Sequence, residues 1–198
     1  MIQLRQVTAG YPGKIVLRDF SLTLPESGAI AVMAPSGYGK TTFLRLLSGL
    51  LAPLSGSISG LEGKRAAYLF QEDRLLPWLT AEKNVEIVSG PEPAHFWLEQ
   101  MEITDGGQYP RAMSGGMQRR VALARAMAYG GDILLLDEPF KGLDEALRSR
   151  IAARIRGQFP LTVLSVHDAE EARLMDALIV RLDQINSENT QEKSPERR

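Results

Sequence analysis

The sequence predicts an α/β fold: a mostly parallel sheet with helices, a small N-terminal antiparallel β-subdomain and an inserted helical subdomain. Three observations predict this fold class. Short, continuously apolar segments are typical of strands that are buried on both faces. Amphipathic stretches lie between them, as expected of the crossover helices of a parallel sheet. A stretch containing several prolines interrupts this alternation, which indicates an insert.

The composition is that of an ordinary globular domain. The chain has 198 residues, 44% of them hydrophobic and 24% charged, which favours one domain, expected over residues 1–185. The tail, residues 186–198, contains no large apolar side chain after Ile185 and is expected to be disordered. The 23 basic and 24 acidic residues give a net charge of −1, which excludes a generally basic nucleic-acid-binding surface.

Several chemistries and a membrane span are also excluded. The chain has no Cys and two His, so it has no disulfide framework, thiolate zinc site or Cys nucleophile, and little for a His-based metal site. No apolar run approaches the ~18–20 residues that a membrane span needs, and the N-terminus lacks a secretory apolar region. Any role at a membrane is therefore expected to depend on a partner.

The N-terminal third of the sequence predicts the first strands and the first helix. Residues 1–24 alternate apolar and polar side chains around a turn at Tyr11-Pro12-Gly13, which favours an antiparallel hairpin. Residues 29–33 form a buried strand, followed by a glycine-containing loop. A helix is expected over residues 41–50, with Phe43, Leu44, Leu46, Leu47 and Leu50 on its apolar face.

The inserted helical subdomain is expected in the middle of the chain, over about residues 72–113. It contains Pro77, Pro91, Pro93 and Pro110 and only short helical patterns. An apolar cluster lies near its start. This cluster is either a docking patch for a partner or local core of the insert, and it comprises Leu75, Leu76, Trp78 and Leu79.

The last third returns to the α/β alternation. Buried strands are expected over residues 133–136, 161–166 and 177–182. Between the first two, Leu147, Ile151 and Ile155 have the spacing of one apolar face of a crossover helix.

The loop after the strand at 29–33 is a candidate phosphate-binding loop, which makes the fold a P-loop NTPase. Gly37 and Gly39 permit a backbone that turns successive N–H groups toward one anion, at the N-terminus of the next helix. Lys40 would neutralise phosphate charge and Thr41 would bind Mg²⁺. The first glycine of the motif is replaced by Ala34, which precedes Pro35 and is expected to keep a negative φ. The expected ATP-binding residues of the loop are Ser36, Gly37, Tyr38, Gly39, Lys40, Thr41 and Thr42.

A second segment supplies the expected second half of a nucleoside-triphosphate site. The strand at 133–136 ends in Asp137 and Glu138, at the sheet edge where α/β proteins bind ligands. Asp137 could hold Mg²⁺ through water and Glu138 could polarise the attacking water; alone, the pair could equally be a solvated strand end. Ser114 precedes Gly115 and Gly116 at a helix start, which by itself indicates only a capped helix.

The ordered set of motifs resembles the ATP-binding-cassette (ABC) transporter ATPases over roughly residues 1–182. The set comprises the phosphate loop, Gln71 in Tyr-Leu-Phe-Gln-Glu, Ser-Gly-Gly, Leu-Leu-Leu-Asp-Glu-Pro, Gly-Leu-Asp144 and Ser-Val-His167-Asp. The run Arg74-Leu-Leu-Pro-Trp-Leu-Thr80 and Met117 resemble the branch that imports nitrate, sulfonates and taurine.

The resemblance implies roles for individual residues. Tyr11 would stack on adenine, unless it only fills a hairpin pocket. Gln71 would touch Mg²⁺ or the lytic water, rather than being a solvated loop amide. His167 would contact the γ-phosphate and assist Glu138 as a catalytic residue; the other histidine, His95, is expected at the surface. Ser114, Gly115, Gly116 and Asp144 would contact ATP bound to a second copy, although Asp144 could also be a helix N-cap.

The implied function is that of an ATPase that powers a small-molecule importer by ATP-dependent dimerisation. Its cofactors would be ATP and Mg²⁺, the metal being held by Thr41, Gln71 and Asp137. Its partners would be transmembrane permease subunits and a solute-binding protein, with no nucleic acid, at the cytoplasmic face of the cell membrane. The alternatives are a dimerisation switch with little turnover and an ABC ATPase outside transport.

Overall fold

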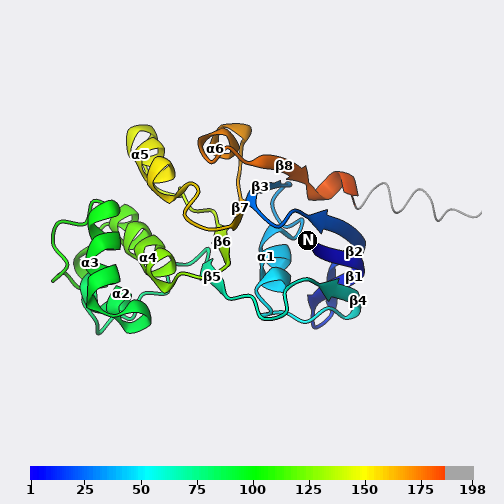
Figure 1. The fold of residues 1–198 in the computed structure, drawn as a ribbon, viewed down its shortest axis with the longest axis horizontal. Coiled ribbons are helices and arrows are strands. Elements are labelled where there is room, and N and C mark those ends of the chain that lie inside the picture. Colours follow the sequence, from blue (N-terminus) through cyan, green and yellow to red (C-terminus); the bar gives the residue numbers. More distant parts are fainter. Residues whose placement is uncertain (186–198) are drawn as a thin grey trace, which may run out of the picture.

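Two sheets organise the computed structural model, which describes residues 1–185 (Figure 1). An antiparallel sheet has the order β2-β1-β4, and a five-stranded parallel sheet has the order β5-β6-β7-β3-β8. This arrangement confirms the predicted fold class. The predicted tail, residues 186–198, lies outside the described residues.

The elements have the following bounds. The antiparallel sheet comprises β1 (Ile2–Tyr11), β2 (Lys14–Leu24) and β4 (Ser55–Ser59). The parallel sheet comprises β3 (Gly28–Met33), β5 (Ala66–Leu69), β6 (Ile133–Asp137), β7 (Leu161–Ser165) and β8 (Leu178–Arg181). The helices are α1 (Lys40–Leu47), α2 (Ala81–Ser89), α3 (Pro91–Gln100), α4 (Gly115–Tyr129), α5 (Glu145–Ile155) and α6 (Ala169–Leu174), with a 3₁₀ turn η1 (Pro110–Ala112).

The parallel sheet separates two hydrophobic cores. Because side chains of a strand alternate between its faces, Ile133 and Leu135 pack toward α1 and the antiparallel sheet, while Leu134 and Leu136 pack toward α4. All four side chains are buried, which explains why β6 is continuously apolar. The same alternation gives Asp137 the face that α1 covers.

Helix α1 is shorter than predicted. It ends at Leu47, and Gly49 follows in the left-handed region at φ 74°, a conformation that terminates helices. Leu50 is 59% exposed, so the expectation that it lies on the buried face is wrong. Phe43, Leu44 and Leu46 are buried as expected.

Two strands between α1 and the insert were not predicted. β4 pairs antiparallel with β1, and β5 forms an edge of the parallel sheet beside β6. Both are short, at 5 and 4 residues. Runs of this length carry little periodicity, so only their pairing identifies them as strands.

Helices α2, α3 and α4 lie at the end of the molecule opposite the antiparallel sheet (Figure 1). They share one hydrophobic core with one face of the parallel sheet. Of the apolar cluster noted in the sequence, Leu75 packs against this core, whereas Trp78 is 69% exposed. The cluster is therefore divided between core and surface.

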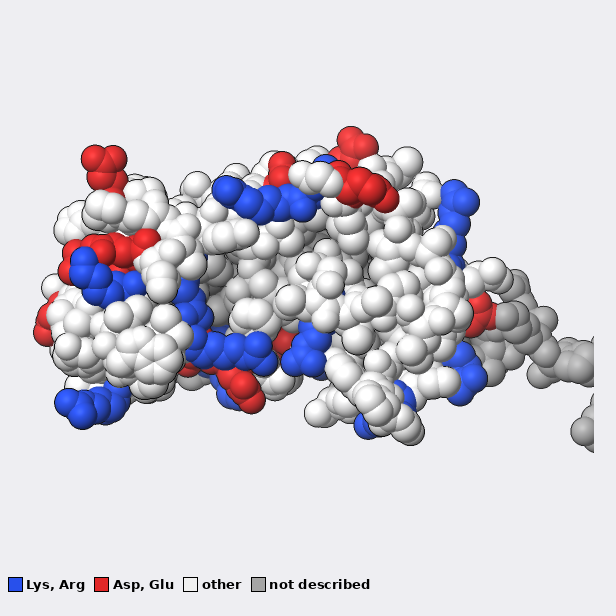
Figure 2. All heavy atoms as spheres, turned by 90° about the horizontal axis from the view of Figure 1, so that it is seen from below, with Lys and Arg blue, Asp and Glu red and all other residues white. Residues whose placement is uncertain are grey.

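Charge is distributed in small groups of both signs on the face shown in Figure 2, with a broad uncharged area between them. This pattern agrees with the near balance of basic and acidic residues. Among residues 1–185, no helix combines the length and apolarity that crossing a membrane requires.

Candidate functional site

A cavity of about 320 Å³ lies at the carboxyl edge of the parallel sheet, beside the antiparallel sheet. Most of the residues predicted for nucleotide binding and catalysis line it. It is lined by Tyr11, Lys14, Val16, Ser36, Gly37, Gly39, Lys40, Thr41, Thr42, Gln71, Glu138 and His167. Lys14 and Val16 were not predicted from the sequence, because they reach the cavity from β2 only through the folding of the β1–β2 hairpin over the loop.

The floor of this cavity is the loop between β3 and α1. Gly37 and Gly39 have φ of 81° and 99°, which agrees with a backbone that presents its N–H groups to an anion. Lys40 is nearly buried, and its ammonium group donates to the carbonyl oxygen of Ala34 at 2.7 Å. Ala34 is absent from the positive-φ residues, so its expected conformation is confirmed.

The N-terminus of α1 faces the cavity without a cap. Gly39 occupies the N-cap position, makes no side-chain capping bond, and no acidic residue lies in the first turn. The first N–H groups of a helix lack intrahelical partners and carry partial positive charge. This helix end can therefore bind a phosphate.

The two acidic residues at the end of β6 are held by one hydroxyl group. The Ser165 hydroxyl donates to Asp137 Oδ1 at 2.7 Å and accepts from the Glu138 backbone N–H at 2.9 Å. The other carboxylate oxygen, Asp137 Oδ2, is buried and has no hydrogen-bond partner. Ser165 was not identified from the sequence, because a serine at a strand end has no distinguishing pattern.

The three predicted catalytic residues meet at the mouth of the cavity. His167 Nε2 lies 3.1 Å from Glu138 Oε1, and the Gln71 side-chain amide lies 3.5 Å from the same oxygen. They follow strands β7, β6 and β5, whose carboxyl ends share one edge of the sheet. Parallel topology thus assembles residues that are far apart in the sequence.

Arg119 of α4 binds the backbone at this edge of the sheet. It is 2% exposed and donates to the carbonyl oxygens of Phe70, Asp137 and Glu138, as well as to the Asp73 carboxylate at 2.8 Å. The sequence analysis missed it. Its signal was a charged residue in line with the apolar positions 122, 123 and 126 of one helix face.

Tyr11 lies at the opposite wall of the cavity. Its hydroxyl accepts from Arg45 NH1 at 2.8 Å, and the same guanidinium lies 5.8 Å from the ring centroid. Arg45 therefore fixes the ring of Tyr11. The ring is 38% exposed and can stack on a planar ligand.

Five of the residues predicted to contact ATP lie off this cavity. Tyr38 is 51% exposed and does not line it. Ser114 caps α4 by accepting from Met117 N–H at 3.3 Å, and Asp144 caps α5 by accepting from Leu147 N–H at 2.9 Å. A Cβ on Gly116 would lie 3.0 Å from the Gly142 carbonyl oxygen, so the first turn of α4 lies beside the loop before α5. Gly115, the fourth residue predicted to contact ATP of a second copy, also does not line the cavity.

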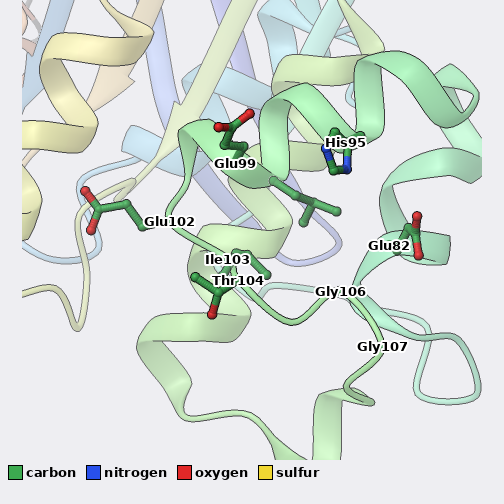
Figure 3. Close-up of a pocket in the computed structure, with 9 residues that line it drawn as sticks. Glu82, His95, Glu99, Glu102, Ile103, Thr104, Gly106 and Gly107 are labelled. Carbon is green, nitrogen blue, oxygen red and sulfur yellow. The ribbon is translucent and has the colours of Figure 1, made fainter.

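A second cavity, of about 480 Å³, lies within the insert (Figure 3). Glu82, His95 and Glu99 line it, and the Glu102 side chain extends away from it toward α5. His95 is exposed, as expected. This cavity shares no lining residue with the predicted nucleotide site.

Comparison with known proteins identifies similar sequences and structures. The family model described as ABC transporter matches residues 17–141. An aliphatic sulfonates import ATP-binding protein (SsuB 1) of Pseudomonas savastanoi pv. phaseolicola is 35% identical over 190 residues, covering 91% of this chain and 80% of that protein. A taurine import ATP-binding protein (TauB) of Escherichia coli O157:H7 is 36% identical over 203 residues, covering 92% and 79%.

Among solved structures, a dimeric post-hydrolysis state of the ATP-binding cassette MJ0796 bound to ADP and Pi superposes with a TM-score of 0.80 at 27% identity. The alignment covers 91% of this chain and 94% of that one. The similarity therefore extends over the fold and over the sequence that carries the site.

Proposed function

The chain belongs to the ABC transporter family and is an ATP-binding, ATP-hydrolysing subunit, and we propose that its ATP-dependent dimerisation drives a small-molecule importer. The observation that carries the proposal is the meeting of Gln71, Glu138 and His167 at the mouth of the cavity above the phosphate loop. The names of the relatives support import as the direction of transport. Cargo would be selected by the permease and by a solute-binding protein.

Binding of ATP would use both walls of the cavity. The uncapped start of α1 and the N–H groups of Gly37 and of residues 39–42 would hold the phosphates. Lys40 would supply positive charge once it leaves the carbonyl oxygen of Ala34. Tyr11, held by Arg45, would stack on the adenine.

The residues at the base of the cavity fit a magnesium ion. Thr41, Gln71 and Asp137 line one small pocket, and all three supply the oxygen atoms that Mg²⁺ prefers. The unpartnered Asp137 Oδ2 is a buried anionic oxygen that a hydrated cation would satisfy. The chemistry that Mg²⁺ supplies when bound is neutralisation of phosphate charge.

Hydrolysis would be carried out by Glu138 and its neighbours. Glu138 would accept a proton from the attacking water, His167 would hold the Glu138 carboxylate and the γ-phosphate, and Gln71 would orient the water. The backbone of Glu138 is held at its N–H by Ser165 and at its carbonyl oxygen by Arg119. The carboxylate is therefore positioned before substrate binds.

A second copy would complete the site. Ser114, Gly115, Gly116 and Asp144 do not line the cavity of their own chain, and the two segments that carry them are adjacent. These segments would contact ATP bound to the other copy, so that each nucleotide joins two chains. The dimeric ATP-binding-cassette structures among the neighbours support this arrangement.

The permease would dock beside the insert, at the cytoplasmic face of the membrane. A groove of about 400 Å³ between β5, α2 and α4 has a mainly apolar lining that includes Leu76, Ile87 and Val88. Phe70 and Arg74 line this groove and also the small pocket that contains Gln71. A permease segment seated here would therefore touch the loop that carries a catalytic residue.

Replacement of Glu138 by Gln tests the hydrolytic role. The amide keeps the shape of the side chain but cannot accept a proton, so ATP turnover should fall about 10²–10⁴-fold. Phosphate release measures turnover, a fluorescent ATP analogue measures binding, and light scattering measures mass. ATP binding should persist, and an ATP-bound dimer should accumulate.

Glu92→Gln is the matched control, because Glu92 is an exposed acid of α3 away from the cavity. It should keep the turnover of the unmodified chain. Undiminished hydrolysis by Glu138→Gln would remove Glu138 from its role. Negligible hydrolysis by the unmodified chain would favour a dimerisation switch instead.

A further inference from the structure

A small pocket of about 60 Å³ adjoins the nucleotide cavity at its base. Two of its lining residues, Tyr68 and Asp137, each present a buried side-chain oxygen: the Tyr68 hydroxyl and Asp137 Oδ2. Within residues 1–185, neither oxygen has a hydrogen-bond partner. Buried polar atoms are rarely left unpaired in proteins. Two such oxygens in one pocket indicate that something polar belongs between them.

The topology of the sheet directs Tyr68 to this place. Tyr68 pairs with Leu135 in the parallel ladder of β5 and β6, and both contribute to the core on the α1 side. Asp137 follows Leu135 by two residues and so faces the same side. The phenol ring stacks on Phe70 with centroids 4.4 Å apart, which holds the hydroxyl beside the strand end.

The phenol is a hydrogen-bond donor under ordinary conditions. A tyrosine hydroxyl has an ordinary pKa of about 10. It therefore keeps its proton at neutral pH and can donate to an oxygen atom. Asp137 Oδ2 can only accept.

The pocket is large enough for ordered water. Its volume of about 60 Å³ compares with the ~30 Å³ that one water occupies in the liquid. Tyr68, Asp137, Thr41 and Gln71 all line it, so a water here would find more than the two polar partners it needs.

We propose that Tyr68 is a positioning residue of the magnesium site, whose hydroxyl holds a water shared with Asp137 in the hydration shell of the metal. The inference rests on the magnesium site of the proposed function. The hydroxyl of Tyr68 would orient a water bound to the metal. Thr41, Gln71 and Asp137 would supply the other protein oxygens around the metal.

Tyr68→Phe tests the proposal, because it removes the hydroxyl and keeps the ring. Mn²⁺ replaces Mg²⁺ as the probe, and electron paramagnetic resonance measures free Mn²⁺ in a titration of the full chain with a non-hydrolysable ATP analogue. The affinity for Mn²⁺ should fall about 10-fold, as for other residues that orient a metal ligand. Binding of the analogue in EDTA, followed by fluorescence, should not change.

Two further variants separate the hydroxyl from the ring. Tyr129→Phe removes the hydroxyl of a tyrosine that lies in the neighbouring groove, outside the pocket, and should keep the Mn²⁺ affinity of the unmodified chain. Tyr68→Leu removes ring and hydroxyl together. If Tyr68→Phe binds Mn²⁺ normally and only Tyr68→Leu binds it weakly, the ring is what matters and the proposal is wrong.

The outcome for the unmodified chain tells the two proposals apart. If it binds no Mn²⁺ together with the nucleotide, the proposed magnesium site itself fails. If it binds Mn²⁺ and Tyr68→Phe binds it equally well, only the role of Tyr68 fails. If Tyr68→Phe weakens the metal-free nucleotide complex as much as the metal complex, the hydroxyl acts on the nucleotide and the proposal is overturned.

Discussion

The backbone of Glu138, the proposed catalytic base, holds its side chain in place. It lies in the left-handed region at φ 53°, which is uncommon for a residue with a Cβ. Hydrogen bonds from Arg119 and to Ser165 secure the peptide groups on either side of its Cα. Contacts of this kind maintain an unfavourable conformation where function requires it, and here they aim the carboxylate at His167.

Gly39 is the residue at which the phosphate loop leaves no room for a side chain. Its φ is 99°, and a Cβ would lie 2.9 Å from Val16 Cγ1 and 3.0 Å from Leu17 Cδ2. Gly39→Ala should therefore be strained by the order of 1–3 kcal/mol. For a chain of this size the melting temperature should fall by about 2–12 °C, measured by calorimetry.

Gly115→Ala is the matched control for stability. Gly115 begins α4, its φ is not positive, and a Cβ there meets nothing within 4 Å. Since alanine is a better helix former than glycine, this variant should melt at the same temperature or higher. An equal loss of stability in both variants would contradict the steric argument at Gly39.

At the scale of elements, three arginines bind the segment that directly follows α3. Arg150 of α5 forms two hydrogen bonds to the Glu102 carboxylate, at 2.8 and 3.0 Å, and Arg154 lies 3.1 Å from it. Arg120 of α4 donates to the carbonyl oxygens of Met101 and Glu102 at 2.7 Å each. Side chains of α4 and α5 thus join the insert to the rest of the molecule.

The contacts of Glu102 with these arginines make the stability of the fold depend on pH. The hydrogen bond from Arg150, with the charges of the neighbouring arginines, holds the pKa of Glu102 below its ordinary value of 4.5. A lowered pKa in the folded state stabilises the protein above the unfolded-state pKa, and this contribution is lost as the pH falls through the folded-state pKa. Glu102→Gln should therefore melt below the unmodified chain at pH 7, and the difference should shrink below about pH 4.5.

Glu99→Gln is the control for this prediction, since Glu99 is an exposed acid in the last turn of α3, three residues before Glu102. Its melting temperature should follow that of the unmodified chain at each pH. A Glu102→Gln difference that stayed constant from pH 7 to pH 3 would show that the carboxylate charge is not what joins α3 to α5.

At the scale of the whole molecule, the residues of the site fall into two groups on one chain. Gln71, Glu138 and His167 surround the cavity, whereas Ser114 and Asp144 cap the starts of α4 and α5 outside it. Such a division requires either that the second group is only structural or that it completes a site on another copy. The oligomeric state decides between these readings.

Ser114→Arg should prevent dimer formation by introducing a long charged side chain at the proposed contact. With a non-hydrolysable ATP analogue, the mass by light scattering should change from twice 21.8 kDa to 21.8 kDa. The analogue should still bind each monomer, because Ser114 lies off the cavity of its own chain. Loss of the cap should also cost about 1 kcal/mol of stability.

Ser59→Arg, on the exposed strand β4, provides the same change of charge and size elsewhere. It should dimerise like the unmodified chain. A Ser114→Arg chain that still dimerises with the analogue would exclude the loop before α4 from the interface.

The features that the sequence determined by itself are local. The phosphate loop, its tolerance of Ala34 and the caps at Ser114 and Asp144 depend on φ preferences and on hydrogen bonds spanning three or fewer residues. The buried strand β6 depends on an uninterrupted apolar run. Neighbouring residues carry all the information that these features need, so each could be predicted in advance.

The tertiary structure alone decided what depends on distant contacts. β5 is a strand because it pairs with β6, and Ser165 matters because the register of β6 and β7 sets it opposite Asp137. Arg119 and Tyr68 belong to the site only because α4 and β5 pack against the same strand end. Packing and strand register are set by the whole chain, and no local pattern encodes which buried hydroxyl or guanidinium will face the carboxyl edge of the parallel sheet.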